Sequence, residues 1–476
     1  MTSVKLGAYT PKNNSTEYLD INLGIFFDGT KNSKTNTNER LANTSAFQKN
    51  GKDDDESSYY NDWSNVARLW DNYDKGTSLY IEGIGTEDKK EDSTIGYAFG
   101  SGDTGIRGKV RIACEKIVSE KLSRIIMANS SKKLRSITFD VFGFSRGAAA
   151  ARNFVYEIGK SSYKPSVVVE PRSGSVAKFD SDGKSTSAQV LPACGHLGLM
   201  CQQAGFKIEL NQVKVRFLGI FDTVSSYSKY ISPTPNFNDV EELHLNEIGR
   251  AQNVIHFVAE NEHRQNFSLT RVNMGKEKSF PGVHSDVGGS YDTGPEVKEE
   301  LETTWTNRNN LEPFKRKLIE QAWFKEEELE ITGGFAYFAL KGSRKLIKKE
   351  YSYIPLHFMA QYAKMANNPI NTTKVEETKY SISDDALLVR VKGYLKDYVM
   401  GNGQPYTFKP LGDLDRKYAG AKIPQQKYAD YQKEKQQQQD LRILRNKYLH
   451  WSADRKSSYG IVQPMAPNAN GNRINY

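Results

Sequence analysis

Residues Ser136–Arg152 read SITFDVFGFSRGAAAAR, and this stretch decides the fold. A run of β-branched and aromatic residues stops at Gly143, and an alanine-rich run with high helix propensity begins after Gly147. Between them lies the motif Gly-x-Ser-x-Gly, with Ser145 at its centre. The pattern predicts a strand, a sharp turn and a helix, with Ser145 at the apex as a nucleophile. The alternative is a tight strand–helix turn with a buried or capping serine, and the rest of the chain must decide between the two.

Composition narrows the class of protein. The chain has 476 residues, of which 37% are hydrophobic and 26% charged, as in a soluble globular protein with a sizeable core. No apolar run approaches the roughly 20 residues of a membrane span. Residues Met1–Glu17 are polar and lack the apolar centre of a signal peptide. We therefore expect that export, if it occurs, depends on a dedicated machine or a fused carrier.

The same composition disfavours several kinds of site. The three cysteines, Cys114, Cys194 and Cys201, form no disulfide framework and have no metal-ligand spacing. No phosphate-binding loop, dinucleotide fingerprint or basic nucleic-acid motif occurs. We expect no cofactor, no metal and no nucleic-acid partner. The net charge of +9 is compatible with an anionic membrane surface or an acidic partner, and equally with neither.

An early strand supplies a candidate for the oxyanion hole. Residues Asp20–Phe27 read as a strand entering a sheet core, and Asp28–Asn32 follow as a turn of small polar residues. In serine hydrolases, such a turn usually supplies one oxyanion-binding N–H, and the residue after the nucleophile supplies the other. The candidates are therefore Gly29, Thr30 and Arg146, although Asp28–Asn32 could equally be a surface turn. An amphipathic helix predicted from Ile106 to about Met127 leads into the Ser145 strand, which favours parallel pairing.

Two later strands offer an acid and a base. The apolar run from Val213 ends at Asp222, and an acid at the carboxyl end of a parallel strand lies where ligands bind in such sheets. Residues Phe280–Tyr291 place His284 after a short apolar run and before two glycines. The order serine, acid, histidine is the one expected of α/β-hydrolases. We predict that Ser145 attacks an acyl carbon, His284 moves the proton, and Asp222 orients the imidazole.

Each of these roles has competitors. Glu260 and Glu262 follow the next strand and are alternatives to Asp222 as the acid. His450 lies late in the chain, where a base would also be in order. Asp286 is expected to form a turn or to support His284. The remaining histidines that we weighed fit other settings: a core strand (His256), an exposed helix-like stretch (His244), a helix facing core or cleft (His357), and a position near the cysteines with no supporting pattern (His196).

The chain changes character after about Glu299. Lysine and glutamate recur in helix-like patterns, for example over Phe314–Glu330, and Ile354–Ala363 read as a helix opened by proline. Lys427–Tyr448 should be an exposed helix or a disordered stretch, and the last dozen residues should be frayed. We predict an α/β-hydrolase-like, mostly parallel sheet with helices on both faces over residues 15–300. Residues 301–476 should form a largely helical region packed on this core, as a possible lid or membrane-docking element.

Four segments occur in the same order in the type VI secretion lipase effectors of the first family, which this chain resembles: Phe26–Thr30, Gly143–Ala149, Gly219–Val224 and Phe280–Gly289. The resemblance covers residues 20 to 295, with a weaker echo at Ile354–Met359. It implies an α/β-hydrolase domain in which Ser145, Asp222 and His284 form the triad. It also implies phospholipase activity on glycerophospholipids, delivery by a secretion spike or adaptor protein into a rival's periplasm, and a cognate immunity protein.

Three hypotheses follow for the function. The first is a metal-independent antibacterial phospholipase of the A type, acting on a phospholipid membrane. The second is a serine esterase or thioesterase on a smaller acyl substrate. The third is a non-catalytic binding module with the same fold, and the presence of all three candidate triad residues in order counts against it.

Overall fold

The computed structural model describes residues 17–54, 56–92, 105–169, 175–225, 239–418, 425–456, 464, 473, 475 and 476. The polar N-terminal stretch up to residue 16 and the glycine-rich segment 97–104 therefore lie outside the described residues.

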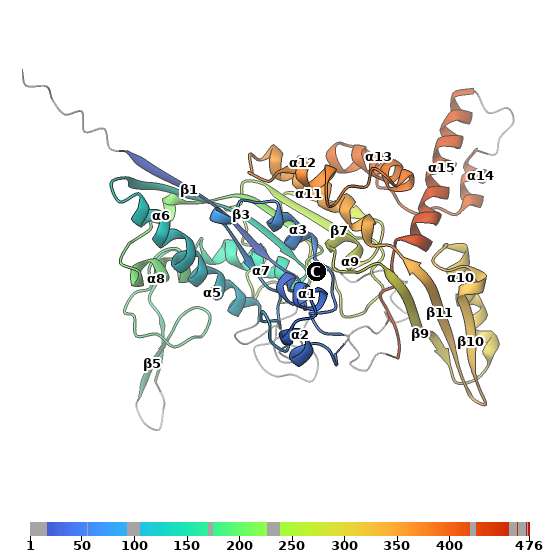
Figure 1. The fold of residues 1–476 in the computed structure, drawn as a ribbon, viewed down its shortest axis with the longest axis horizontal. Helices are drawn as coiled ribbons and strands as arrows, with labels where there is room; N and C mark the ends of the chain where they lie inside the picture. The colour runs from blue at the N-terminus through green and yellow to red at the C-terminus, as the bar shows by residue number, and fades with distance from the viewer. Residues whose placement is uncertain are drawn as a thin grey trace, which may run out of the picture.

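A parallel sheet forms the centre of the molecule (Figure 1). Within the described residues it has six strands in the order β2-β1-β3-β6-β7-β8, and each strand pairs in parallel with its neighbours. Parallel neighbours need crossover connections, which carry helices over the two faces. The strands are β1 (Tyr18–Phe27), β2 (Ser78–Ile81), β3 (Lys133–Phe144), β6 (Val213–Phe221), β7 (Val254–Ala259) and β8 (Lys276–Phe280).

Alternating side chains divide the core into two layers. Phe27, Phe139 and Val141 point to one face, where they join a cluster with α5 (Ile106–Lys116), α7 (Arg146–Glu157) and α8 (Gly195–Gln203). Phe26 and Phe142 point to the other, where α3 (Asn65–Asp71) and α11 (Tyr353–Met365) cover the sheet. Because a strand has a side-chain period of two, both faces of this sheet are buried. The predicted α/β fold with helices on both faces is confirmed.

The helix predicted before the Ser145 strand is also confirmed. It runs from α5 through a π-helical stretch (Ile117–Leu122) into α6 (Ser123–Ala128), and it turns Ile106, Val110, Cys114 and Ile117 into the core. Residues 159–189 include a small hairpin of β4 (Ser166–Val169) and β5 (Val176–Phe179). Its side chains are exposed or half-buried, as is typical of an insertion on the surface.

A second sheet, which the sequence did not reveal, follows the core. β9 (Gly294–Thr304), β10 (Leu329–Gly334) and β11 (Tyr337–Ile347) pair antiparallel in the order β10-β11-β9. The helix-like pattern over 314–330 yields only α10 (Glu312–Glu320). Residue 300 lies inside β9, so a division of the chain at that point stays a proposal.

Helices make up most of the remaining chain. They are α11, α12 (Thr372–Glu377), α13 (Ala386–Met400), α14 (Leu411–Tyr418) and α15 (Gln425–Lys447). α15 and α14 project together at one end of the molecule (Figure 1). The first part of α15 is exposed as predicted, but Leu441 and Leu444 near its end are fully buried. The largely helical character predicted for this region is confirmed.

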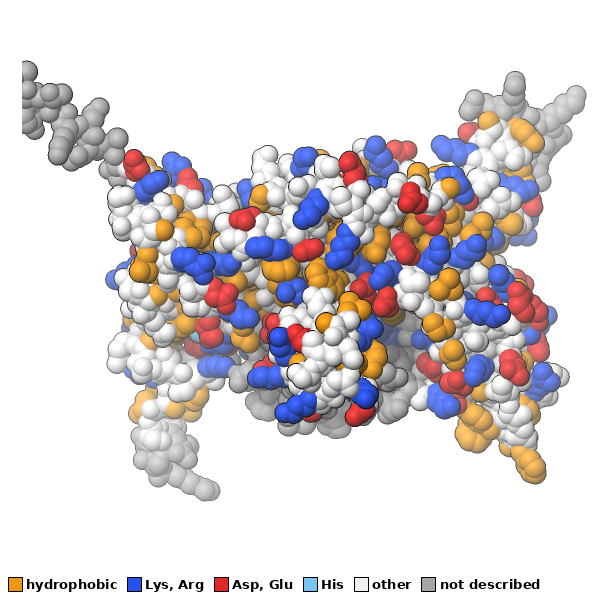
Figure 2. Space-filling view, viewed as in Figure 1, with side chains coloured by type: hydrophobic (Ala, Val, Ile, Leu, Met, Phe, Trp, Pro, Cys, Tyr) orange, Lys and Arg blue, Asp and Glu red, His pale blue; other side chains and the backbone are white. Residues whose placement is uncertain are grey.

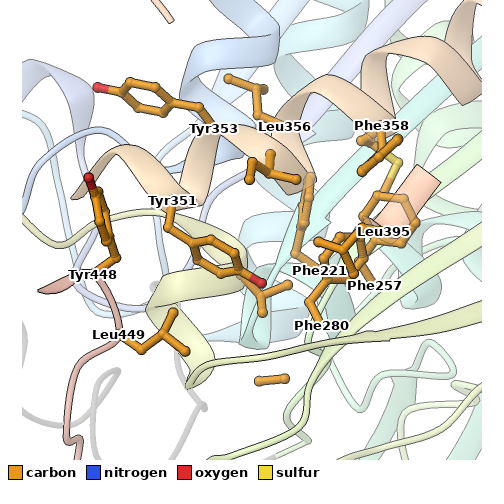
Figure 3. Close-up of a cluster of buried hydrophobic side chains, with 14 of the residues drawn as sticks. Phe221, Phe257, Phe280, Tyr351, Tyr353, Leu356, Phe358, Leu395, Tyr448 and Leu449 are labelled. Atoms are coloured by element: carbon orange, nitrogen blue, oxygen red, sulfur yellow. The ribbon is translucent and has the colours of Figure 1, made fainter. Parts of the chain in front are cut away.

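Aromatic side chains fix α11 on the carboxyl ends of the strands (Figure 3). Phe221, Phe257 and Phe280 are the last or nearly the last residues of β6, β7 and β8, and all three are buried. The centroid of the Phe280 ring lies 4.8 Å from the ring centroid of Phe257 and 6.2 Å from that of Phe358 on α11. α11 thus contacts the edge of the sheet where Asp222 follows β6.

The surface carries charges of both signs. Figure 2 shows basic and acidic side chains interspersed over the visible face, without a large area of one sign. Hydrophobic side chains appear at the free end of the second sheet, where Phe335 and Trp305 are exposed. Among the described residues, no helix is both long and apolar enough to cross a membrane.

Candidate active site

Ser145 occupies a strained turn between β3 and α7. β3 ends at Phe144 and α7 begins at Arg146, and Ser145 between them has φ 59° and ψ −128°. A side chain costs energy at this positive φ, and such outliers occur often at functional sites. A Cβ at Gly147 would lie 2.1 Å from the carbonyl oxygen of Asp28, and one at Gly143 would lie 2.5 Å from that of Gly147. The turn therefore excludes side chains at both glycines, as the motif predicts.

Strand pairing places Asp222 beside Ser145. Phe144 at the end of β3 is in register with Phe221 at the end of β6, so the residues that follow them are neighbours. The backbone N–H of Ser145 donates to the Phe221 carbonyl at 3.0 Å, and that of Val224 donates to the Ser145 carbonyl at 3.4 Å. Asp222 is itself strained, with φ 42°, and its side chain is fully buried.

His284 reaches Asp222, and Phe144 before Ser145, from the next part of the sheet. It is the first residue of α9 (His284–Gly288), which begins shortly after β8. Its Nδ1 lies 2.5 Å from Oδ2 of Asp222. Its ring also lies against the ring of Phe144, the residue before Ser145, with centroids 4.6 Å apart. Because Nδ1 donates to the carboxylate, Nε2 is the nitrogen that can accept a proton.

The described hydrogen bonds include none between Ser145 Oγ and Nε2 of His284. Such bonds are often long before substrate binds and tighten afterwards. The structure therefore brings the three predicted residues together through backbone pairing and the Phe144 ring, with the acid–histidine bond formed.

Burial and charge hold this site in a defined protonation state. Ser145 and His284 are 4% exposed and Asp222 is 0% exposed. Burial would raise the pKa of Asp222, but Arg473 and His284 together hold that pKa well below its usual range. Burial lowers the pKa of His284, although Asp222 opposes this shift. Asp222 is thus a carboxylate, and His284 favours the neutral form that can act as a base.

The turn after β1 lies against the start of α7, where an oxyanion would form. Arg146 Nε donates to the Thr30 hydroxyl at 2.7 Å, which joins two of the predicted oxyanion residues. The N–H of Gly29 donates to Oδ1 of Asp28 at 2.7 Å, so this donor is engaged within the turn. Burial raises the pKa of that Asp28 carboxyl to about 6. Among the three predicted residues, Thr30 and Arg146 are therefore the better placed to supply backbone donors.

A protein-family model matches residues 22–309, and its description is the catalytic domain of Tle1-like phospholipase effectors of the type VI secretion system. This match spans more than half of the chain and includes Ser145, Asp222 and His284. The chain belongs to the Tle1-like phospholipase effector family.

One solved structure agrees with the fold. A Tle1 effector bound to the VgrG spike of the type 6 secretion system is 20% identical, with a TM-score of 0.57 over 99% of this chain and 98% of that one. An uncharacterized protein from Pseudomonas aeruginosa is 17% identical, with a TM-score of 0.38 over 90% of this chain and 59% of that one. No curated protein matches the chain. The first of these structures supports the Tle1-like fold over essentially the whole chain.

The described hydrogen bonds place neither competing acid on the imidazole of His284 in this Tle1-like chain. Glu262 accepts the backbone N–H of His284 at 3.1 Å and is paired with Arg264 at 2.7 Å, so it contacts the histidine backbone and not its ring. Burial raises the pKa of Glu260 to about 7. Asp222 has the geometry of a triad acid, and Glu262 supports the start of α9.

The other histidines are engaged elsewhere. His256 is fully buried in β7, as predicted, with Nδ1 3.0 Å from Glu277. His357 is buried on α11, where Nε2 donates to the Tyr380 carbonyl at 2.8 Å, and it lines a pocket of about 450 Å³ that shares no residue with the candidate triad. His450 contacts Asp286 at 2.7 Å, and Asp286 also accepts the N–H of Val283 at the start of α9. Asp286 is thus the supporting residue that we predicted.

Arg473 is the residue that sequence reasoning missed. Both of its terminal nitrogens contact Asp222, at 2.7 and 2.8 Å, although the two residues are 251 positions apart. Among the last dozen residues, which we expected to be frayed, Arg473 is anchored on the site; this expectation was wrong at that position. No local pattern marks a single arginine as the partner of a distant acid. Among the described residues, no cluster of histidine, cysteine, aspartate and glutamate could hold a metal ion.

Proposed function

We propose that this member of the family is an antibacterial phospholipase of the A type that uses Ser145, His284 and Asp222 as its triad. Ser145 Oγ attacks the acyl carbon of a glycerophospholipid ester while Nε2 of His284 takes its proton. His284 returns that proton to the leaving lysophospholipid alcohol, and water then releases the fatty acid from the acyl-enzyme by the same route. Backbone N–H groups of Arg146 and Thr30 bind the oxyanion.

One observation carries the proposal. The 2.5 Å contact between His284 Nδ1 and Asp222 Oδ2 fixes the imidazole beside the strained Ser145 turn, within the segment that the family model matches. A serine that only capped a helix would need neither the buried acid nor the oriented imidazole. The family supplies the substrate class, since its members are phospholipase effectors.

The first experiment measures fatty-acid release from vesicles of phosphatidylethanolamine and phosphatidylglycerol with different chains at the two ester positions. We expect the wild type to release fatty acid and Ser145→Ala to release none, and the chain released identifies the ester position. Ser136→Ala is the matched control, because Ser136 lies on β3, the strand that leads into Ser145, is also largely buried, and bonds to Asp20 far from the site. Activity that survives Ser145→Ala contradicts the triad.

A second readout separates the alternatives. Ser145-dependent cleavage of a short soluble ester without vesicle activity would favour an esterase or thioesterase on a smaller acyl substrate. Inactivity on both substrates would favour a binding module.

Delivery and protection follow from the family. The Tle1 effector of similar fold was solved bound to a VgrG spike, and we infer that this chain also travels on a secretion spike or adaptor protein from the cytoplasm that makes it. It would then act on phospholipid in the rival's periplasm, and a cognate immunity protein would protect the producer. Ser145-dependent killing on expression in the periplasm of a bacterial host, but not in its cytoplasm, tests this placement.

A further inference from the structure

The guanidinium group of Arg473 covers the side of Asp222 that His284 does not occupy. Nη1 lies 2.7 Å from Oδ1 and Nη2 lies 2.8 Å from Oδ2, a two-point contact with both oxygens. Nε donates to the carbonyl of Phe267 at 2.6 Å, and the side chain is only 6% exposed. Arginine alone among the basic side chains offers this planar fork to a carboxylate.

Backbone pairing holds Arg473 in place. The N–H of Tyr476 donates to the Leu269 carbonyl and that of Arg271 donates to the Tyr476 carbonyl, both at 2.8 Å. Asn475 forms a parallel bridge with Leu269. The segment so engaged also carries Phe267, whose ring meets that of His284 edge-on at 5.0 Å. The chain around Arg473 is therefore anchored on the same loop that borders the histidine.

The contacts of Asp222 explain what Arg473 adds. Oδ1 accepts the N–H of Ala259 at 2.8 Å, and Oδ2 accepts from His284. Each oxygen has one further contact, and in both cases Arg473 is the donor. Without Arg473 the carboxylate could turn about its last side-chain bond and weaken the contact with Nδ1.

We propose that Arg473 is a positioning residue of this site, which holds the carboxylate of Asp222 in the orientation that receives Nδ1–H of His284. The inference rests on the proposed triad. It also means that the segment matched by the family model, residues 22–309, lacks one residue that the site needs.

The charges around His284 predict a second effect. Asp222, Glu262 and Arg264 are the charged groups next to the imidazole, and Arg473 is paired with Asp222. His256 is also near Asp222, and its Nε2 accepts the backbone N–H of Thr223. Glu262 and Arg264 are paired, as are Asp222 and Arg473, so the charges nearly balance. Removal of Arg473 leaves one carboxylate uncompensated beside the imidazole, which stabilises the imidazolium and raises the pKa of His284.

The test compares Arg473→Gln and Arg473→Lys with wild type on a short soluble ester, with kcat, KM and the pH dependence of kcat/KM as readouts. For Arg473→Gln we expect kcat to fall on the order of 10- to 100-fold with KM little changed, because Arg473 acts through its contact with Asp222. The acid limb of kcat/KM should lie below roughly pH 6.5 in wild type and move up by about one pH unit in the variant. Arg473→Lys keeps the positive charge but loses the two-point contact. The acid limb of its kcat/KM profile should therefore stay at the wild-type pH, while kcat falls by less than in Arg473→Gln.

Two controls separate the possible failures. Arg271→Gln removes a half-exposed side chain on the loop that pairs with Tyr476, and it should change neither kcat nor the acid limb. Ser145→Ala must abolish turnover in the same assay; if it does not, the proposed function fails. If Ser145→Ala is inactive while Arg473→Gln matches wild type in kcat and pH limb, the triad stands and the role of Arg473 is refuted. Should Arg473→Gln not fold, Arg473→Lys decides: an unchanged kcat overturns the proposal.

Discussion

At the scale of single residues, the candidate site combines backbone strain with compensating contacts. Ser145 and Asp222 both have positive φ, 59° and 42°, although neither is glycine. Each strained residue is held by hydrogen bonds: Ser145 by the backbones of Phe221 and Val224, and Asp222 by Ala259, His284 and Arg473. Because the surroundings fix these conformations, the strain can serve to aim the side chains.

A direct prediction distinguishes the acids. Asp222→Asn should lower kcat by a factor on the order of 10⁴, because a neutral amide neither enforces the Nδ1–H tautomer nor stabilises the imidazolium as a carboxylate does. Glu262→Gln should leave kcat within about tenfold of wild type and mainly reduce stability, because Glu262 binds the backbone of His284 and not its ring. Steady-state kinetics with a thermal melt for each variant checks both. Near-normal turnover of Asp222→Asn together with collapse of Glu262→Gln would move the role to Glu262.

Residues differ in how far the sequence reveals them. Ser145 and its glycines can be recognised locally, because the strand, the turn and the helix that the motif requires follow one another within a few neighbouring residues. Asp222 could be predicted because it follows the apolar strand β6, and His284 because a short apolar run precedes it and two glycines follow it. Arg473 could not, because its role depends on a contact across 251 positions. The oxyanion turn lies between these cases: its position followed from the sequence, but the engagement of the Gly29 N–H by Asp28 did not.

At the scale of elements, the start of α7 is the tightest junction in the site. Gly147 in its first turn approaches the carbonyls of Asp28 and Phe27 so closely that a Cβ would lie 2.1 and 2.5 Å from them. This contact places the helix N-terminus, with its positive dipole end, next to the β1 turn. The second sheet, in contrast, has no sequence pattern that predicts it. In β9, the sequence GPEVKEELETT buries Glu296 and exposes Val297, so no apolar alternation marks it as a strand.

The junction can be tested by adding one methyl group. Gly147→Ala should reduce the free energy of unfolding by roughly 1–3 kcal/mol and lower kcat, because backbone atoms cannot yield as a flexible side chain can. Gly393→Ala is the matched control, since nothing lies within 4 Å of a Cβ there and Gly393 is exposed within α13. That change should stabilise by about 0.5–1 kcal/mol. Urea unfolding measures both, and equal effects of the two substitutions would contradict the close approach.

At the scale of the whole molecule, the chain after the matched domain supports the histidine side of the site. The segment after α15 brings His450 to Asp286 and Ser452 to Glu262. The two acids that support the start of α9 are therefore both bound by residues far from them in sequence. Arg344 on β11 holds this segment in place. It pairs with Glu296 and donates to the carbonyls of Trp323, Arg445 and Leu449. The second sheet thus links the parallel core to the last part of the chain.

This link predicts an unequal effect of two substitutions on β11. Arg344→Met should reduce the free energy of unfolding by roughly 3–5 kcal/mol, because it leaves Glu296 buried without its partner. Lys341→Met removes only the exposed pair with Glu299 and should cost about 0–1 kcal/mol. Arg344 also opposes the rise that burial imposes on the pKa of Glu296, and the net pKa in the folded protein is lowered. That contribution to stability is present at neutral pH and is lost as the pH falls.

In Arg344→Met, burial is no longer opposed by Arg344, the strongest of the charges that lower the pKa of Glu296, so this pKa rises. The deficit relative to wild type should therefore be largest at neutral pH and narrow on acidification. Chemical unfolding of both variants at neutral and at mildly acidic pH measures this. A deficit that is the same at both pH values, or the same for Arg344→Met and Lys341→Met, would show that the buried pair does not hold the second sheet to the core.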